Sequence, residues 1–183
     1  MISILFDKNI VKVLTYFLIS PGSRYTRKEI KEKTEMNNIP LDKTLTKVKA
    51  LKLISKKKKL YALNFNTEKN KEIFDIISNE YKYFNIPYRI FNIIVETAEK
   101  LSKYKSVKSA ILFGSYAKLI QTENSDIDIS IIMENKIKKE TDKIKKEIGK
   151  LSRKIELHFF EEKDMKADDP LIKDILKNGK VIL

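Results

Sequence analysis

The chain has 183 residues, which allows one large domain or two small ones and excludes a long repeat array. Hydrophobic residues make up 42% and charged residues 34%, so a packed core is expected and extensive disorder is excluded. There is no cysteine and one histidine, which excludes disulfides, thiolate zinc sites and multi-histidine metal sites. No apolar run reaches the roughly 18 residues of a membrane span, and Asp7 and Lys8 interrupt the start where a signal peptide would continue its apolar stretch. We therefore expect a soluble cytoplasmic protein that does not bind membranes.

The formal net charge of +13 points to a polyanionic partner. Only four of the 38 basic residues are arginine, and a lysine bias of this kind also arises from composition alone. The distribution is more informative, since residues 1–65 hold 15 Lys and Arg against 5 Asp and Glu, whereas residues 86–183 hold 20 against 16. The positive charge is concentrated in the N-terminal part.

The N-terminal third predicts three short helices and a β-hairpin. Apolar residues at helical spacing indicate a first helix over 8–19. Thr26 and Glu29 have the spacing of a capping box, so a second helix should run from there to about Glu35. A third helix is expected from near Pro40, and two strands within 53–63 should flank a basic turn at 55–59.

This order of elements resembles the winged helix-turn-helix family of DNA-binding domains over about residues 5–65. The resemblance implies that the third helix enters the major groove of duplex DNA and that the hairpin contacts the phosphate backbone. The residues that it assigns to DNA lie on the third helix and in the turn: Lys43, Thr46, Lys47, Lys56, Lys57, Lys58 and Lys59. Because lysine lacks the planar fork of arginine, attraction to the backbone is better supported than base reading. Winged helices also dock proteins, and that alternative stays open.

Gly114 and Ser115 follow an apolar strand in the second half of the chain. Glycine lets the chain turn sharply, and the serine offers its hydroxyl and free backbone amides to a phosphate. Further on, Asp126 and Asp128 project to the same face of an extended segment. Two such carboxylates repel each other unless a cation lies between them, and their hard oxygens suit Mg²⁺ bound jointly with nucleotide phosphates.

Two motifs resemble the nucleotidyltransferase superfamily that includes DNA polymerase beta, and particularly its minimal nucleotidyltransferases. They are Leu112-Phe113-Gly114-Ser115-Tyr116-Ala117 and Ser125-Asp126-Ile127-Asp128-Ile129. The resemblance covers about residues 86–183. It implies Mg²⁺ as cofactor, a nucleoside triphosphate (ATP favoured) as substrate, Asp126 and Asp128 as catalytic metal ligands, and Gly114 and Ser115 as phosphate-binding residues.

That family needs a third carboxylate on a neighbouring strand. The alternation from Lys154 to Phe160 puts Glu156 and His158 on one face, and Glu156 matches the third catalytic and metal-binding residue. It would bind a second metal or accept the proton of an attacking hydroxyl. The usual residue is Asp, so a surface Glu on an edge strand is the alternative. His158 is assigned no role, since a lone histidine is more often structural.

The motif departs from the family at its end. Minimal members continue Gly-Ser with an Ala-Arg-Gly run, whereas here Ala117 is followed by Lys118 and Leu119. Lys118 keeps a positive charge for binding the triphosphate, without the bidentate geometry of arginine. A solvated helix lysine is the alternative, and the missing glycine at 119 leaves the geometry of the loop open.

The predicted fold class is α+β. It has three parts: a winged helix-turn-helix domain (1–65), a linker helix (66–85) and a nucleotidyltransferase domain with a mixed sheet faced by helices (86–183).

The predicted function is Mg²⁺-dependent transfer of a nucleoside monophosphate, AMP favoured, to a hydroxyl. The resemblance suggests a protein acceptor, as in antitoxins that adenylylate a partner HEPN-type ribonuclease toxin, with duplex DNA bound by the first domain. The alternative is a DNA-binding transcriptional regulator whose nucleotidyltransferase fold senses nucleotide or docks a partner. A homodimer is compatible with the sequence.

Overall fold

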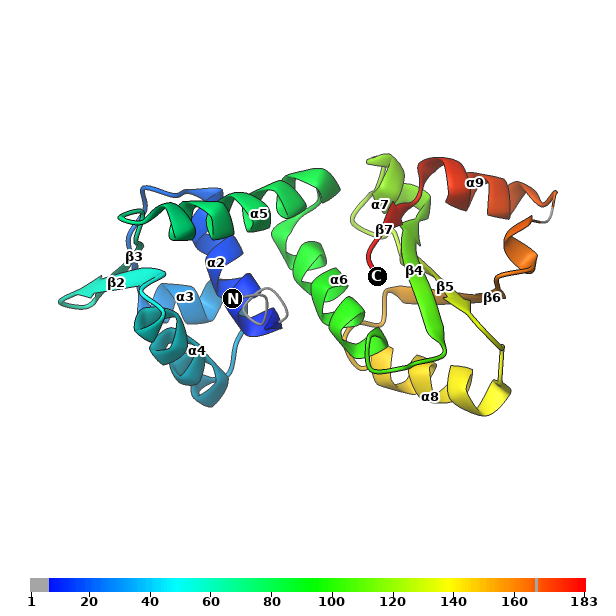
Figure 1. The fold of residues 1–183 in the computed structure, drawn as a ribbon, viewed down its shortest axis with the longest axis horizontal. Coiled ribbons are helices and arrows are strands. Elements are labelled where there is room, and N and C mark those ends of the chain that lie inside the picture. Colours follow the sequence, from blue (N-terminus) through cyan, green and yellow to red (C-terminus); the bar gives the residue numbers. More distant parts are fainter. Residues whose placement is uncertain (1–6, 167) are drawn as a thin grey trace. The chain divides into compact units, whose positions relative to one another are not determined.

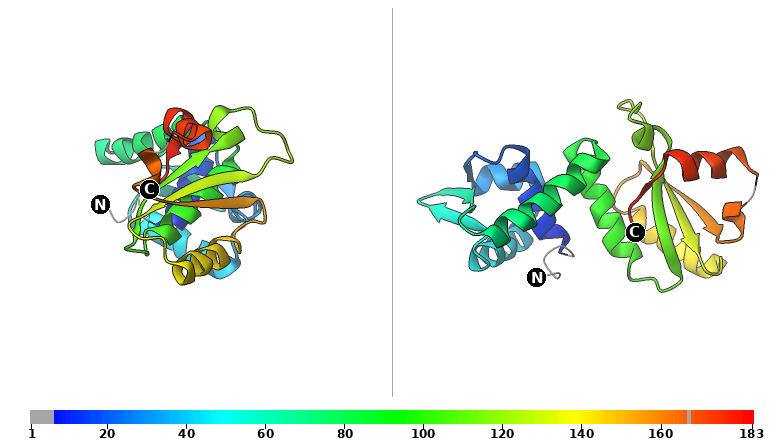
Figure 2. Two further views of the ribbon diagram at one scale, coloured as in Figure 1. Left: turned by 90° about the vertical axis from the view of Figure 1, so that its right-hand side faces the viewer. Right: turned by 45° about the horizontal axis from the view of Figure 1, so that its top comes forward.

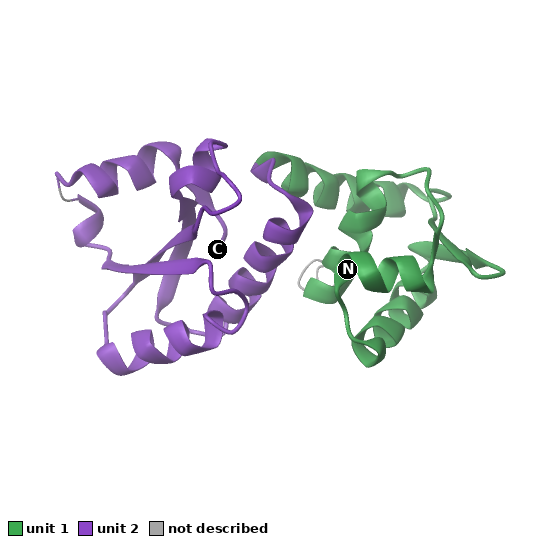
Figure 3. Cartoon of the chain, turned by 180° about the vertical axis from the view of Figure 1, so that it is seen from behind, with its two compact units in different colours: residues 1–83 green, residues 84–183 purple. Residues whose placement is uncertain are grey.

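The computed structural model describes residues 7–166 and 168–183, and the chain divides into two compact units, Met1–Tyr83 and Phe84–Leu183 (Figure 3). Residues 1–6 lie outside the described residues. They are the part of the chain that was compared with a signal peptide and the first six residues of the predicted 1–65 domain. Within the described part of the chain, no helix is both long and apolar enough to span a membrane.

The first unit combines helices with a small antiparallel sheet (Figure 1). Its elements are α2 (Lys8–Ile19), β1 (Tyr25–Thr26), α3 (Arg27–Thr34), α4 (Asn38–Ala50), β2 (Ile54–Lys57), β3 (Leu60–Leu63) and α5 (Glu68–Phe84). The strands have the order β1-β3-β2, and both pairings are antiparallel.

The starts of these helices follow from their capping residues. The carboxylate of Asp7 accepts hydrogen bonds from the first backbone amides of α2. The predicted capping box is confirmed, because Glu29 N–H donates to Thr26 Oγ1 at 3.3 Å while Thr26 N–H donates to Glu29 Oε2 at 2.7 Å. Helix α4 begins at Asn38, before the predicted start near Pro40, because a proline is tolerated in the first turn of a helix.

The hairpin is longer than predicted. Strand β2 continues to Lys57, so only Lys58 and Lys59 form the turn instead of the expected 55–59. Lys58 has a φ of 56°, a left-handed conformation that closes this short connection.

Helix α5 packs within the first unit. Ile73, Phe74 and Ile77 of α5 are buried. Asn70 Nδ2 also donates to the backbone oxygens of Lys52 at 2.9 Å and Asn64 at 2.7 Å, which ties α5 to the segments flanking the hairpin. The segment predicted as a separate linker helix therefore shares the core of this unit.

The second unit contains a four-stranded mixed sheet (Figure 1). Its elements are α6 (Tyr88–Leu101), β4 (Val107–Phe113), α7 (Gly114–Lys118), β5 (Ile127–Met133), α8 (Lys138–Ile148), β6 (Ile155–Glu161), η1 (Asp164–Lys166), α9 (Pro170–Asn178) and β7 (Lys180–Val181). The strand order is β6-β5-β4-β7; β5 and β6 are parallel, and the other two pairings are antiparallel. The predicted mixed sheet faced by helices is confirmed.

Helices cover both faces of this sheet, with α9 and α8 on opposite sides (Figure 2). On the α9 side, Ile111 and Phe113 of β4 pack with Ile172 and Ile175 of α9. Residues directly opposite on paired strands share a face, so Ser130, the partner of Ile111, and Asp128, the partner of Phe113, also lie on the α9 side. The alternate residues of β5, which include Ile129, are fully buried on the other face.

Candidate active site

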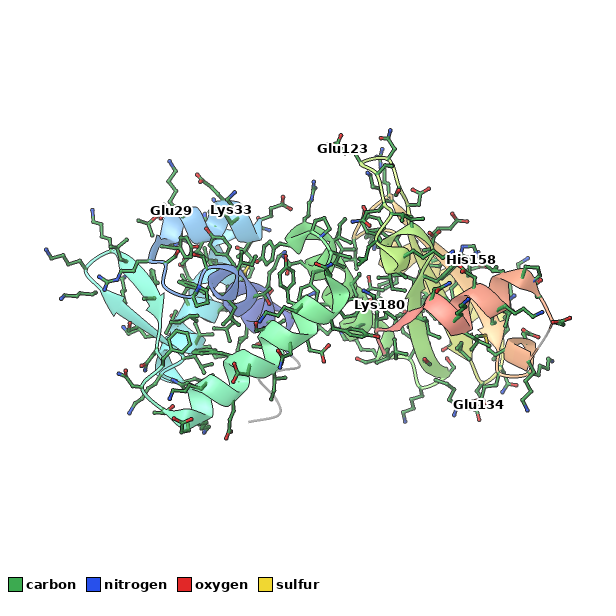
Figure 4. The ribbon with its side chains drawn as sticks, turned by 90° about the horizontal axis from the view of Figure 1, so that it is seen from above. Glu29, Lys33, Glu123, Glu134, His158 and Lys180 are labelled. Atoms are coloured by element: carbon green, nitrogen blue, oxygen red, sulfur yellow. The ribbon has the colours of Figure 1, made fainter. Side chains whose placement is uncertain are left out.

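Asp128 and Glu156 are direct neighbours on parallel strands β5 and β6. Their side chains project from the same face of the sheet, and His158 lies two residues further along β6 on that face. Ligand atoms of Asp128, Glu156 and His158 all lie within 4.8 Å of one another. The His158 side chain is labelled in Figure 4, where the second unit is seen from the α9 side. The fold thus brings together two acidic residues predicted from the sequence and adds an imidazole.

Gly114 forms one wall of this cluster. It follows β4 directly, opens α7 and has a φ of 68°, a conformation that L side chains rarely adopt. A Cβ at this position would overlap Oδ2 of Asp128 and lie 3.0 Å from its Cγ. The space beside Gly114 is therefore filled by the Asp128 carboxylate, and both backbone conformation and packing require glycine.

The electrostatics of the cluster disfavour a charged Asp128. Burial, followed by the negative charge of Glu156, raises the pKa of the Asp128 carboxyl above its ordinary value, and His158 partly opposes this shift. His158 Nε2 lies 3.5 Å from Glu156 Oε1. Among the described residues, no lysine or arginine forms an ion pair with Asp128 or Glu156, although the chain has 38 basic residues. Within the described part of the chain, the basic side chain that lies beside these carboxylates is therefore the imidazole of His158.

Asp126 lies outside this three-residue cluster. It is exposed and immediately precedes β5, which begins at Ile127. Its charge nevertheless acts on the site, because it contributes to the raised pKa of Asp128 and, after burial, to the raised pKa of Tyr116 on α7. The loop before it is held by a hydrogen bond from Thr122 N–H to Ser125 Oγ at 2.9 Å. Asp126 is thus at the rim of the site, on the α7 side.

Ser115 and Lys118 both lie on α7, next to the cluster. Ser115 is partly buried in the first turn, where its backbone amide and hydroxyl follow Gly114. The ammonium group of Lys118 forms an ion pair with Asp174 of α9 at 2.7 Å. This hydrogen bond, together with one from Asn178, lowers the pKa of Asp174. The Lys118 ammonium group is thus directed toward α9.

The sequence left the geometry of the loop after α7 open, because position 119 holds leucine where the family has glycine. In the structure, Leu119 sets this geometry. This residue ends α7 in the left-handed region, with a φ of 60°, and its backbone N–H donates to the oxygen of Ser115. A leucine has adopted the conformation that a glycine adopts without strain. The tight turn after Gly114 and Ser115 therefore forms in this chain without a second glycine.

His158 was not predicted as a site residue, yet it lies in the cluster. Its ring is fixed by an edge-to-face contact with Phe113, with ring centroids 5.1 Å apart. The signal was present in the sequence, because the alternation that puts Glu156 on this face also puts His158 there. What the sequence lacked was the register that aligns β6 with Asp128.

The residues predicted to bind DNA all lie on the first unit and are exposed. They are Lys43, Thr46 and Lys47 on α4, Lys56 and Lys57 on β2, and Lys58 and Lys59 in the turn. Two of these lysines have intramolecular partners: Lys47 Nζ lies 2.8 Å from Asp7 Oδ2, and Lys56 Nζ lies 5.1 Å from the centroid of the Tyr61 ring. Among the described residues, no ion-pair partner is found for Lys43 or for Lys57 to Lys59.

The donor set on the second unit, with carboxylates that face each other beside a tight Gly-Ser turn, is typical of domains that transfer phosphate-linked groups with the help of a divalent cation. Residues 96–183 match the family described as "Polymerase beta, Nucleotidyltransferase". This match supports the predicted resemblance to the nucleotidyltransferase superfamily over residues 96–183.

A crystal structure of a "putative nucleotidyltransferase" from Sulfolobus solfataricus is 18% identical in sequence, with a TM-score of 0.34 over 57% of this chain and 83% of that chain. None of the curated proteins matches the sequence.

Proposed function

We propose that the second unit transfers a nucleoside monophosphate, AMP in the favoured case, from a nucleoside triphosphate to a hydroxyl group. The observation that carries the proposal is the register pairing of Asp128 with Glu156 beside Gly114. The nucleotidyltransferase match over residues 96–183 supports it, since that match covers Gly114, Ser115 and all three predicted acidic residues.

A divalent cation fits the residues present. Asp128 and Glu156 offer oxygen ligands that repel each other, and no described lysine or arginine neutralises them. Asp126 at the rim provides a third carboxylate. Asp126, Asp128 and Glu156 would hold Mg²⁺, which supplies charge neutralisation at the phosphates of the bound nucleotide.

The remaining groups position the substrate. The backbone amide and hydroxyl of Ser115 bind the β and γ phosphates, and the ammonium group of Lys118, which also binds Asp174, adds positive charge beside them. The acceptor oxygen forms a bond to the α-phosphorus, while the bond from the α-phosphorus to the bridging oxygen breaks and pyrophosphate leaves. Glu156 would accept the proton of the acceptor hydroxyl on the carboxylate oxygen that does not bind the cation. Catalysis of this kind consists mainly of positioning and charge neutralisation.

The test is label transfer from α-labelled nucleoside triphosphates in the presence of Mg²⁺. Asp128→Asn and Glu156→Gln are expected to lower the rate at least about 100-fold, since each removes a group that stabilises charge in the transition state. Asp142→Asn, at an exposed position of α8, is the matched control and should keep the wild-type rate. Equal transfer by wild type and Asp128→Asn would contradict the proposal.

The acceptor is proposed to be a partner protein in a toxin-antitoxin-like pair, with a HEPN-like ribonuclease as the first candidate. The support is the resemblance of the Gly114-Ser115 motif to minimal nucleotidyltransferases. Candidate acceptors are the products of neighbouring genes, each incubated with the labelled nucleotide. Saturable nucleotide binding without transfer to any acceptor would favour the alternative, a DNA-binding regulator whose second unit senses nucleotide.

For the first unit we propose binding to duplex DNA. The support is the exposed set of lysines without ion-pair partners among the described residues: Lys43 on α4, and Lys57 to Lys59 on the hairpin. Replacing Lys43, Lys58 and Lys59 by alanine should weaken DNA binding and flatten its dependence on salt by about one unit of slope per lost phosphate contact. Lys69→Ala, at an exposed position of α5, is the control. Unchanged binding would favour a protein-docking role.

A further inference from the structure

His158 lies where a third ligand of a metal ion bound by Asp128 and Glu156 would lie. Its ring is held against Phe113, its side chain is 28% exposed, and its Nε2 lies 3.5 Å from Glu156 Oε1. The same imidazole lies within 4.8 Å of the Asp128 carboxylate. Two carboxylates and one imidazole on a rigid pair of strands form a donor set of mixed oxygen and nitrogen atoms. Mg²⁺ binds oxygen ligands, whereas transition metal ions accept imidazole as well as carboxylate.

A second observation comes from Ser130. This residue is fully buried, and its Oγ has no hydrogen-bond partner among the described residues. Leaving a buried hydroxyl without a hydrogen-bond partner is unfavourable. Ser130 follows Asp128 by two residues on β5 and is the direct register neighbour of His158 on β6, so its hydroxyl lies on the face that carries the cluster.

These two observations explain each other. A histidine that binds a metal through one ring nitrogen almost always donates the N–H of the other nitrogen to an oxygen. The neighbour of His158 that offers a buried oxygen without a partner is Ser130. The unused hydroxyl is therefore the acceptor expected beside a metal-binding imidazole.

We propose that Asp128, Glu156 and His158 together bind a divalent transition metal ion, represented here by Mn²⁺, more tightly than Mg²⁺, and that Ser130 positions His158 by accepting a hydrogen bond from its second ring nitrogen. The proposal deepens the proposed function, on which it rests for the use of the metal in transfer. The set of ligands is testable without any acceptor.

The experiment exploits the single histidine of the chain. The full-length protein is produced with ¹⁵N-labelled histidine and without a histidine tag, loaded with Mn²⁺ and studied by pulsed electron paramagnetic resonance. A directly bound imidazole gives a ¹⁵N coupling, and in this chain it can come only from His158. We expect the coupling in the wild type and its loss in His158→Phe, which keeps a ring against Phe113.

Affinities give the second measurement. By calorimetry, His158→Phe should weaken Mn²⁺ binding about 10- to 100-fold and change Mg²⁺ binding little, because only the nitrogen ligand is lost. Ser130→Ala should weaken Mn²⁺ binding about tenfold and keep the ¹⁵N coupling. In the Zn²⁺-loaded protein, Ser130→Ala should also move the proton resonance of the second ring N–H upfield and speed its exchange with water, as expected when its hydrogen bond is lost. Asp142→Asn serves as the control and should bind both ions as the wild type does.

The outcomes separate this proposal from the proposed function. Mn²⁺ bound without ¹⁵N coupling, or no Mn²⁺ binding at all, overturns the ligand role of His158 whatever the transfer assay gives. The coupling observed in wild-type protein supports that role even if a variant fails to fold. Coupling without transfer to any acceptor would leave the metal site standing and remove the transferase function.

Discussion

A side chain at Gly114 would occupy the place of the Asp128 carboxylate, because a Cβ there would overlap Oδ2 of Asp128. Gly114→Ala is therefore expected to lower the free energy of unfolding by about 1–3 kcal/mol, through the left-handed φ of 68° and the forced displacement of Asp128. Transfer should fall more than about tenfold, since displacement of a catalytic group is costly. Urea unfolding and the label-transfer assay measure the two effects.

Gly22→Ala is the matched control for this substitution. A Cβ at Gly22 would meet no heavy atom within 4 Å, and the residue lies in the other unit. Its unfolding free energy and transfer rate should stay near those of the wild type. A Gly114→Ala protein as stable and active as Gly22→Ala would show that Asp128 moves freely and that the close approach has no consequence.

Much of the site could be predicted because strand alternation fixes which residues share a face. The alternation put Glu156 and His158 on one side of a strand, and the spacing of Asp126 and Asp128 put both on one side of another. The parallel register that sets Asp128 beside Glu156 is a tertiary property, fixed by sheet packing and by the Gly114 turn. It could not be derived from either strand alone.

The features that sequence reasoning missed involve partners distant in the chain. Lys118 was predicted either to bind the triphosphate or to be a solvated helix lysine; its ammonium group binds Asp174 of α9, a contact that no local pattern indicates. Helix α5 was expected to be a linker because its pattern shows one apolar stripe without showing what that stripe packs against. The hydrogen bonds of Asn70 to Lys52 and Asn64 give the answer, and they require the folded hairpin.

Asp128→Asn should stabilise the metal-free protein. Burial and the charge of Glu156 raise the pKa of Asp128, so folding disfavours its charged form, and a neutral isostere removes that cost. Because the side chain is partly exposed, we expect a gain of less than about 1 kcal/mol at neutral pH. A divalent cation at about 100 times its dissociation constant should stabilise the wild type by about 2.7 kcal/mol and the variant by much less.

The order of the two thermal midpoints is thus expected to reverse when the cation is added. Differential scanning calorimetry with chelator and then with Mn²⁺ measures both conditions, and Asp142→Asn should follow the wild type in each. A variant less stable than the wild type in chelator would show that Asp128 is a structural hydrogen-bond acceptor. Equal stabilisation of both proteins by the cation would locate cation binding elsewhere.

Leu119→Gly and Ile120→Gly should change the free energy of unfolding in opposite directions. Leu119 has a φ of 60°, which costs a side chain about 1 kcal/mol or more, so Leu119→Gly should raise the unfolding free energy by up to about 1 kcal/mol despite the more flexible unfolded chain. Ile120 is also exposed but has no left-handed φ, so Ile120→Gly should lower stability by about 0.5–1 kcal/mol. Urea unfolding compares the two, and a loss of stability in both variants would show that the Leu119 side chain contributes packing that exceeds its strain.

Tyr104 gives the second unit a pH-dependent stability above neutral pH. Its hydroxyl donates to Glu147 Oε2 at 2.6 Å, and burial, followed by this hydrogen bond, raises the pKa of Tyr104 to about 12. A raised pKa means that the stabilisation is complete below the ordinary tyrosine value of about 10 and is lost as the pH rises through about 12.

Tyr104→Phe should therefore lower the free energy of unfolding by about 0.5–1.5 kcal/mol at pH 7, and the difference from wild type should shrink in strong alkali. Burial also raises the pKa of Tyr16 to about 12, so ultraviolet titration of tyrosinate, with urea-unfolded chain as reference, should show several late tyrosines and one fewer of them in Tyr104→Phe. A difference spectrum between wild type and Tyr104→Phe that titrates near 10 would contradict the hydrogen bond.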